Sequence, residues 1–310
     1  MNTPQIVIYT DNTNATLSSL ATTECTIGIQ AFISGATFGS DGTCTLSYDW
    51  PMQQAIAPEP SSGKTQVQIA REKGLKVLAA VGGETFSTSV WHQCDANIDG
   101  FVTALTDFVT SNNFDGIDID WEDSAAAIGQ GGYNAVDFLV SLTQKLKEAL
   151  PTDQNMITHA PQPPYLDPEW YGGPYLDVMR QAGDDIDYLN IQYYNNPAWV
   201  GDDNNPASET QYVAGTVGSP PFSTSIVGLQ TQGLKPSQLL IGKPTTDQNS
   251  GSGYISASDV ATYIIAPLRA ASQEFGGVMG WQYAVSPGGS EVVTQWISTI
   301  STALNQQNKK

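Results

Sequence analysis

Short apolar segments rich in β-branched residues recur along the whole chain and alternate with longer segments of helical periodicity. Several of the short segments are apolar almost throughout, which is typical of parallel strands that are covered on both faces. Eight such segments stand out, at residues 5–10, 26–33, 75–82, 114–121, 156–161, 187–194, 238–243 and 277–283. The pattern therefore predicts eight parallel strands connected by helices.

The intervals between these strands contain the predicted helices. Apolar residues recur at helical spacing over residues 97–112, 133–149, 258–274 and 290–306, and Ser258 is expected to cap the third helix. Eight βα units in 310 residues favour a closed (β/α)₈ TIM barrel over an open sheet, because such barrels typically take ~250 residues. Neither a linker nor an internal repeat divides the chain, so we expect residues 1–310 to form a single α/β domain.

Three polar segments rich in Gly and Pro follow predicted strands directly, at residues 34–62, 163–175 and 196–222. In a barrel, such segments are loops on the C-terminal face, where active sites lie. Their aromatic residues are Trp50, Tyr165, Trp170, Tyr171, Trp199 and Phe222. We expect these segments to be loops that border an active site.

The net charge of the chain disfavours two classes of binding partner. Thirty-one acidic and twelve basic residues give a formal net charge of −19. This field repels phosphate backbones and anionic lipid, so we expect neither nucleic-acid nor membrane partners. No apolar run approaches the ~18 residues of a membrane span, which predicts a soluble protein. The N-terminal residues lack the basic and apolar regions of a signal peptide.

Cysteine and histidine are too few and too scattered for a metal site. Cys25, Cys44 and Cys94 form no CxxC pair, and His92 and His159 are far apart in the sequence. We therefore expect no zinc site and no cofactor. Two alternatives remain for the cysteines. One is a disulfide between Cys25 and Cys44, the two that lie nearest each other in sequence, and the other is three reduced thiols.

Three acids interrupt the fourth predicted strand. Asp118, Asp120 and Glu122 are spaced by two, which places their side chains on one face, roughly 6.5–7 Å apart. Burial and mutual repulsion raise the pKa of such carboxyl groups. Folding does not require this arrangement, and Asp is depleted in strands. Carboxyl groups with raised pKa values suit general acid/base catalysis, so we interpret the cluster as catalytic.

Two other interpretations of the cluster fail, and one stays open. A D-x-D-x-D-G calcium loop would need glycine where Trp121 or Asp123 stands. A solvated edge strand would not alternate acids with Ile and Trp in the middle of eight parallel strands. A structural acid with satisfied partners remains an alternative for Asp115 and Asp118.

The segment now resembles a known signature. Asp115, Asp118, Asp120 and Glu122 match DxxDxDxE of the family 18 glycoside hydrolases, the chitinase family. Further segments resemble the family's motifs on strands three, five, six and eight: AAVGG at 79–83, APQ at 160–162, IQYYNNP at 191–197 and GVMGW at 277–281. The strand-five and strand-six segments are similar to those of hevamine-like plant and fungal chitinases. The motifs follow the family order, so the resemblance covers most of the chain.

The resemblance implies a retaining, substrate-assisted reaction, an exception to the usual two-carboxylate scheme. Glu122 would protonate the glycosidic oxygen, and the substrate's 2-acetamido oxygen would attack the anomeric carbon to give an oxazolinium intermediate. Asp120 would bind the acetamido N–H, and Tyr194 would hold the acetamido oxygen. Asp118 would share a proton with Asp120.

The same resemblance implies a set of substrate-binding residues. Trp281 would stack beneath the reacting sugar, and the other cleft residues are Gln162, Asn195 and Gly83. Tyr193 and Tyr194 are adjacent, so only one can face the barrel interior, and Asn195 would act from the strand end. Tyr9 and Phe32 are candidates for either the cleft or the core.

Two departures from the hevamine pattern leave the substrate open. Trp121 resembles bacterial-type chitinases, and the segments 34–62 and 196–222 match no hevamine pattern. We expect hydrolysis of β-1,4-linked N-acetylglucosamine, as in chitin, and keep as an alternative an endo-β-N-acetylglucosaminidase that cuts the core of N-linked glycans. A non-catalytic chitinase-like lectin is disfavoured because Glu122, Asp120 and Tyr194 are intact. The resemblance further suggests an extracellular, monomeric enzyme with a carbohydrate substrate.

Overall fold

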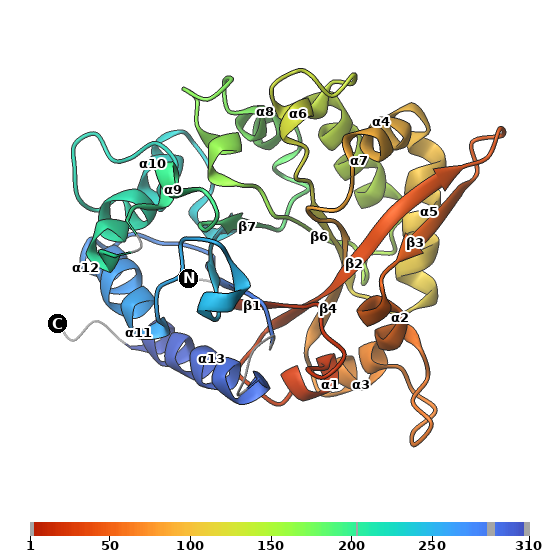
Figure 1. The fold of residues 1–310 in the computed structure, drawn as a ribbon, viewed down its shortest axis with the longest axis horizontal. Helices are drawn as coiled ribbons and strands as arrows, with labels where there is room; N and C mark the ends of the chain where they lie inside the picture. The colour runs from red at the N-terminus through yellow and green to blue at the C-terminus, as the bar shows by residue number, and fades with distance from the viewer. Residues whose placement is uncertain (1–2, 203, 284–288, 307–310) are drawn as a thin grey trace.

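The computed structural model describes residues 3–202, 204–283 and 289–306. Eight parallel strands form a ring in the order β1-β2-β4-β5-β6-β7-β8-β9, and β1 pairs with both β2 and β9, which closes the barrel (Figure 1). The strands are β1 Gln5–Thr10, β2 Ile27–Phe38, β4 Lys76–Gly82, β5 Gly116–Asp120, β6 Met156–His159, β7 Tyr188–Gln192, β8 Leu239–Pro244 and β9 Gly277–Trp281. The predicted (β/α)₈ barrel is confirmed.

Helices surround this ring. The α-helices are α1 Leu17–Leu20, α2 Trp50–Ile56, α3 Gln66–Glu72, α4 Thr88–Ala96, α5 Ile98–Ser111, α6 Ser124–Ala127, α7 Ala135–Ala149, α8 Pro174–Ala182, α9 Pro197–Val200, α10 Ile226–Thr231, α11 Ala257–Asp259, α12 Ala266–Ala270 and α13 Gly289–Asn305. Shorter turns are the 3₁₀ segments η1 Pro163–Leu166, η2 Pro206–Ser208, η4 Pro236–Gln238 and η5 Asp247–Asn249, and the π-helical segments η3 Thr210–Ala214 and η6 Val260–Ile265. Within the described ranges, no helix is both long and apolar enough to cross a bilayer.

The four predicted helices correspond to α5, α7, the run from α11 through η6 to α12, and α13. The predicted cap of the third helix is wrong. Ser256 accepts a hydrogen bond from the Asp259 backbone N–H, so the helix begins two residues earlier and Ser258 lies inside it. A serine side chain one turn before the first apolar residue satisfies a free N–H at the helix start.

Residues 34–62 are not the loop that their composition suggests. Strand β2 continues to Phe38 and turns back as the antiparallel strand β3 (Cys44–Tyr48), after which α2 begins. In β3 the residues Cys44, Leu46 and Tyr48 are half-buried while the polar residues between them are exposed. This period of two is a strand signal that the high content of polar residues in the segment obscures.

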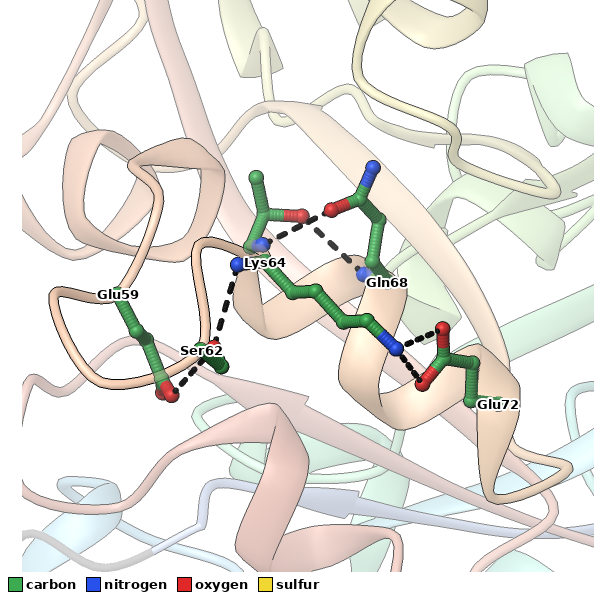
Figure 2. Close-up of polar contacts among 6 residues, drawn as sticks. Glu59, Ser62, Lys64, Gln68 and Glu72 are labelled. Carbon is green, nitrogen blue, oxygen red and sulfur yellow. Dashed lines mark hydrogen bonds and ion pairs between the residues drawn. The ribbon is translucent and has the colours of Figure 1, made fainter.

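The connection between α2 and α3 is held by local polar contacts, which Figure 2 shows. Ser62 Oγ accepts from the Lys64 backbone N–H at 3.2 Å, and Lys64 Nζ reaches the Glu72 carboxylate at 2.6 Å. Thr65 and Gln68 then form a capping box at the start of α3, in which each side chain accepts from the other's backbone N–H. These contacts fix where α3 packs against the barrel.

Of the two cysteine alternatives, the Cys25–Cys44 disulfide is wrong. Cys25 lies just before the start of β2, whereas Cys44 pairs with Phe38 at the far end of that strand. The 12 residues of β2 span roughly 40 Å at ~3.3 Å per residue, and a disulfide needs Cα atoms within about 7 Å. All three cysteines are free.

Strand alternation divides the core into two layers. Outward-facing residues such as Ile117, Ile119 and Val278 pack between the strands and the helices. Inward-facing residues such as Val7, Leu78 and Met279 fill the barrel itself. Polar side chains that point inward near the carboxyl ends of the strands therefore converge on the barrel mouth.

Candidate active site

Strand β5 carries the acid cluster into the barrel. Ile117 and Ile119 face the outer core, so Asp118 and Asp120 face inward, and both carboxyl groups are buried. Glu122 stands two residues beyond the last residue of the strand and is half-buried. The three acids thus form a line from the barrel interior to its mouth, with Glu122 nearest solvent.

Asp118 is the innermost acid and has the most partners. It accepts hydrogen bonds from Tyr9 Oη at 2.7 Å, from Thr158 Oγ1 at 2.5 Å and from Asn190 Nδ2 at 3.2 Å. Burial raises the pKa of Asp118 to about 6, and the three hydrogen bonds act in the opposite direction. Asp118 is therefore held in place and titrates at mildly acidic pH.

Amide side chains connect the two outer acids. Gln192 Nε2 lies 3.0 Å from Asp120 Oδ1 and 3.1 Å from Glu122 Oε1, so these two oxygens are no more than about 6 Å apart. Gln162 Nε2 donates to the other Glu122 oxygen at 3.0 Å. Both oxygens of Glu122 thus face amide donors, which orient its carboxyl group.

These surroundings shift the pKa values of the two acids upward. Burial, followed by the charges of Glu122 and Asp118, raises the pKa of Asp120 well above its usual range. Burial also raises the pKa of Glu122, and the hydrogen bonds from Gln192 and Gln162 oppose that shift. The pair therefore retains a proton at a pH where isolated carboxyl groups are ionised.

Tyr194 faces the barrel interior and Tyr193 faces away, as the predicted alternation requires. Tyr194 lies in the inner cluster of buried side chains, while the Tyr193 hydroxyl donates to the Thr224 carbonyl in the outer layer at 2.6 Å. Burial, and then the charge of Asp120, raise the pKa of Tyr194 well above its ordinary value. The Tyr194 hydroxyl therefore stays protonated and can donate a hydrogen bond.

Three aromatic rings lie together at the barrel mouth. Trp281 meets Tyr9 edge-on at a centroid distance of 5.6 Å, and it meets Phe32 in a tilted arrangement at 5.9 Å. Trp281 and Phe32 are partly exposed, whereas Tyr9 is buried with its hydroxyl on Asp118. Gly83 leaves room for the Phe32 ring, since a Cβ at this position would lie 3.1 Å from Phe32 Cζ.

Asn195 is placed differently from the other predicted site residues. It is exposed, has a φ of +54°, and its Oδ1 accepts from the Gly251 backbone N–H at 2.8 Å. Its own N–H donates to the Ser252 carbonyl. Asn195 thus ties the end of β7 to the segment after β8, and its contact with a sugar remains a prediction.

Three polar residues of the site were missed by the sequence reasoning. Gln192, Asn190 and Thr158 point inward and contact the acids. The signal was present, because counting back from Tyr194 in steps of two gives Gln192 and Asn190. Thr158 is directly opposite Asp118 in the β5–β6 pairing.

Asp115 lies at the opposite end of β5 from Glu122. Its carboxylate meets Arg71 Nε at 3.1 Å and Lys76 Nζ at 2.9 Å, and it accepts from the Val77 backbone N–H at 2.9 Å. These partners satisfy a buried carboxylate and join β4 to β5. The structural interpretation of Asp115 fits this arrangement.

The aromatic residues of the three polar segments differ in exposure. Trp50 and Tyr171 are 61% and 66% exposed, whereas Tyr165 is fully buried. Trp170, Trp199 and Phe222 are half-buried, and Trp199 Nε1 donates to Asp167 Oδ2 at 2.7 Å.

Comparison with known proteins agrees with this geometry. The model of the glycosyl hydrolases family 18 matches residues 5–262. The chain is 27% identical over 307 residues to acidic endochitinase SE2 of Beta vulgaris, covering 93% of this chain and 90% of that protein. It is 24% identical to chitinase Chi52 of Paenibacillus xylanexedens over 86% of its own length, and it spans about half, 53%, of that relative.

Solved structures of family 18 proteins share the fold of this chain. A GH18 chitinase from Pseudoalteromonas aurantia superposes with a TM-score of 0.75 at 30% identity, covering 96% of this chain and 99% of that one. A fungal endo-β-N-acetylglucosaminidase of the same family shares the fold, with a TM-score of 0.68 at 22% identity and coverage of 98% and 99%. The family match extends over most of the barrel, including all three acids of β5 and its end. The chain belongs to family 18 of the glycosyl hydrolases.

Proposed function

We propose that the protein hydrolyses β-1,4 linkages next to N-acetylglucosamine in chitin and its oligomers, with retention of configuration. The observation that carries this proposal is the convergence of Asp118, Asp120 and Tyr194 on one partly exposed acid, Glu122. Of the three acids in this cluster, only Glu122 is accessible from the barrel mouth. Such a site suits a reaction whose nucleophile comes from the substrate.

Glu122 is the proton donor and, later, the base. It transfers its proton to the glycosidic oxygen while the C1–O bond breaks, and the 2-acetamido oxygen of the same sugar forms a bond to C1. Water then attacks C1, gives its proton to Glu122 and reopens the oxazolinium ring. The raised pKa of Glu122 supports this role, because a proton donor must be protonated at the working pH.

Asp120 and Tyr194 hold the acetamido group. Asp120 accepts from the acetamido N–H and stabilises the positive charge that develops on the ring, and the protonated Tyr194 hydroxyl donates to the acetamido oxygen. Asp118 supports Asp120 from below and shares its proton. The three hydrogen bonds on Asp118 fix this support in position.

The aromatic residues at the mouth form the sugar-binding floor. Trp281 and Phe32 are partly exposed and adjacent, so their faces can stack on the reacting sugar, while Gly83 provides the space that Phe32 occupies. Gln162 lines the same cleft through its bond to Glu122. We place Asn195 at the rim of the cleft and Tyr9 beneath it.

The alternative substrate is the two-sugar core of an N-linked glycan. The same acids and the same acetamido chemistry serve both substrates. The exposed Trp50, at the start of α2, could contact a branched glycan as well as a linear chain. We favour chitin because the curated relatives that match over most of this chain are named as chitinases.

We further propose that residues 1–310 act as one catalytic domain and that the enzyme works outside the cell. The first and last barrel strands pair with each other, so both ends of the described chain belong to the same barrel. The relatives named above are chitinases, and a long polymer such as chitin is too large to enter a cell before it is cleaved.

Mass analysis of two digests tests the function. The protein is incubated with a chitin oligomer and, separately, with a high-mannose glycoprotein. Shortened oligomers are the expected products, whereas release of the glycan alone would overturn the chitin assignment in favour of the endoglycosidase. Glu122→Gln should abolish cleavage but retain oligomer binding, and an active Glu122→Gln enzyme would show that the acid is misassigned.

A further inference from the structure

A second groove lies on the same face of the barrel as the acids but shares no residue with them. It encloses about 570 Å³ and is lined by two segments, residues 126–136 and 171–177. These segments include the end of α6 and the start of α8, which Figure 1 shows next to each other on the upper side of the molecule. Helix α6 begins two residues after Glu122, so the groove is close to the active site in the fold.

Tyr171 presents its ring beside this groove. The ring is 66% exposed, and the residue has a φ of +48°, a left-handed conformation that side chains larger than glycine rarely adopt. Gly172 and Gly173 follow, also with positive φ. An exposed aromatic residue held in an unfavourable backbone conformation points to a function for its ring.

A series of ring contacts anchors Tyr171 to the core. Trp170 meets Tyr171 edge-on at 5.1 Å and also contacts Tyr165 at 5.5 Å. Tyr165 is fully buried, contacts Trp121 at 5.4 Å and shares a hydrogen bond with Ser124 Oγ at 2.9 Å. The exposed ring is therefore positioned in advance, which reduces the conformational entropy lost when a ligand binds.

The lining of the groove suits an uncharged, hydroxyl-rich ligand. Besides the Tyr171 ring it presents the Asp177 carboxylate and exposed backbone at Gly132 and Gly172. The Asn134 side chain also lines it, but this amide caps α7 and donates to Asp137. Asp177 is paired with Arg180 at 2.5 Å, which neutralises its charge. The net charge of −19 opposes anionic ligands. A flat ring beside a carboxylate and exposed backbone groups can bind a sugar through its C–H face and its hydroxyl groups.

We propose that this groove is a second carbohydrate-binding site, which holds a segment of an N-acetylglucosamine polymer outside the catalytic cleft, with Tyr171 as its stacking platform. The identity of the sugar rests on the proposed function. Because the groove and the acids share one face, a polymer held there lies near the mouth of the barrel. The site increases the local concentration of polymer without taking part in the reaction.

Adsorption to insoluble chitin tests this site separately from catalysis. The measurement uses the Glu122→Gln protein, which does not consume the polymer, with and without Tyr171→Gly. Glycine removes the ring and tolerates the positive φ, so the backbone is preserved. We expect adsorption to weaken about tenfold, the value of one aromatic stacking contact. Tyr171→Phe, which keeps the ring, should adsorb like the parent.

Two controls define the result. Val217→Ser removes another exposed apolar side chain, 54% exposed, and should leave adsorption unchanged. Tyr171→Gly in the active enzyme should cleave a short soluble oligomer within about twofold of the parent rate, since Tyr171 lies outside the catalytic cleft.

The outcomes separate this site from the proposed function. Unchanged adsorption of Tyr171→Gly, or an equal loss in Val217→Ser, would overturn the second site while leaving chitin cleavage intact. A tenfold loss of short-oligomer cleavage would also overturn it, because Tyr171 would then belong to the cleft. If the parent enzyme cleaves no chitin oligomer but adsorption still depends on the Tyr171 ring, the second site stands and the proposed function falls.

Discussion

Gln192 bridges the two outer acids, Asp120 and Glu122, through hydrogen bonds. Its amide donates to Asp120 and to Glu122 at nearly equal distances, and a third contact to the Ala160 carbonyl at 2.9 Å fixes its position. A hydrogen bond to a carboxylate favours the ionised form. Gln192 therefore lowers the pKa of both acids and limits the increase that burial causes.

Gln192→Leu should move the pH profile of kcat/KM to higher pH. Loss of the amide raises the pKa of Asp120 and Glu122 together, so both limbs of the profile shift upward, and kcat falls by ~10- to 100-fold because the acids lose their orientation. The profile is measured with a soluble chitin oligomer, and Gln144→Leu, an exposed amide on α7, serves as control. A rate loss without any shift in the profile would show that Gln192 has a structural role only.

Asp11, directly after β1, predicts a pH effect on stability. Burial and then the charge of Asp49 raise the pKa of Asp11 to about 7. The folded state therefore binds a proton more tightly than the unfolded chain does, and stability declines as pH rises from about 4 to about 7. Because the side chain is partly exposed, we expect the loss to be roughly 1–2 kcal/mol.

Asp11→Asn should thus raise the melting temperature at pH 8 and leave it nearly unchanged at pH 4. Asp41→Asn provides a control of opposite sign, since hydrogen bonds from Thr43 lower the pKa of Asp41. Equal melting temperatures of Asp11→Asn and the parent at pH 8 would show that Asp11 is ionised at no cost in the folded state.

The sequence was most informative about single residues where a motif and the strand period agreed. Asp118 and Asp120 face inward as the spacing of two required, and Tyr194 faces inward while Tyr193 does not. It was less informative where contacts come from distant strands. The bond between Tyr9 and Asp118 joins residues 109 positions apart, which no local pattern encodes.

Among the elements, β8 and the residue that precedes η3, Glu209, are joined by a buried ion pair. Lys243 is fully buried, and its Nζ lies 2.8 Å from Glu209 Oε1 and 2.9 Å from the Tyr193 carbonyl. The pair fastens the long segment after β7 to the outside of the barrel, next to the Tyr193 carbonyl. Removing one partner leaves an unpaired charge in the interior. The free-energy cost of that charge is much larger than the net stability that the intact pair contributes.

Lys243→Met should lower the free energy of unfolding by about 3–5 kcal/mol. Lys243→Met combined with Glu209→Gln should recover part of this loss, since the uncompensated charge is removed. Lys64→Met breaks the exposed pair drawn in Figure 2 and should change stability by less than about 1 kcal/mol. Urea denaturation measures the free energy of unfolding of all three variants. Similar losses in Lys243→Met and Lys64→Met would show that the buried ion pair contributes no more to stability than the exposed one.

Barrel strands could be predicted to within a few residues, whereas β3 could not. Barrel strands are buried on both faces and therefore read as apolar runs. Strand β3 belongs to a hairpin that projects beyond the barrel, as Figure 1 shows, and none of its five residues is fully buried. Its alternation over five residues is too short to outweigh the polar composition around it.

For the molecule as a whole, the net charge of −19 should distinguish neutral from cationic polymers. A partially deacetylated chitin carries ammonium groups, which this field attracts at low ionic strength and which salt screens. KM for that polymer should rise when the salt concentration is raised from roughly 20 mM to roughly 500 mM, because the Debye length then falls from about 20 Å to about 4 Å. KM for the neutral oligomer should stay constant, and parallel changes for both would show that charge plays no part in binding.

The most direct test of the central claim is a proton NMR time course of cleavage, run in parallel on an N-acetylglucosamine oligomer and on the matched glucosamine oligomer. If Glu122 is the acid and the acetamido group is the nucleophile, the first reducing ends that appear are β-anomers, and they appear only from the acetylated oligomer. Initial α-anomers, or comparable cleavage of the oligomer that lacks acetamido groups, would contradict this mechanism.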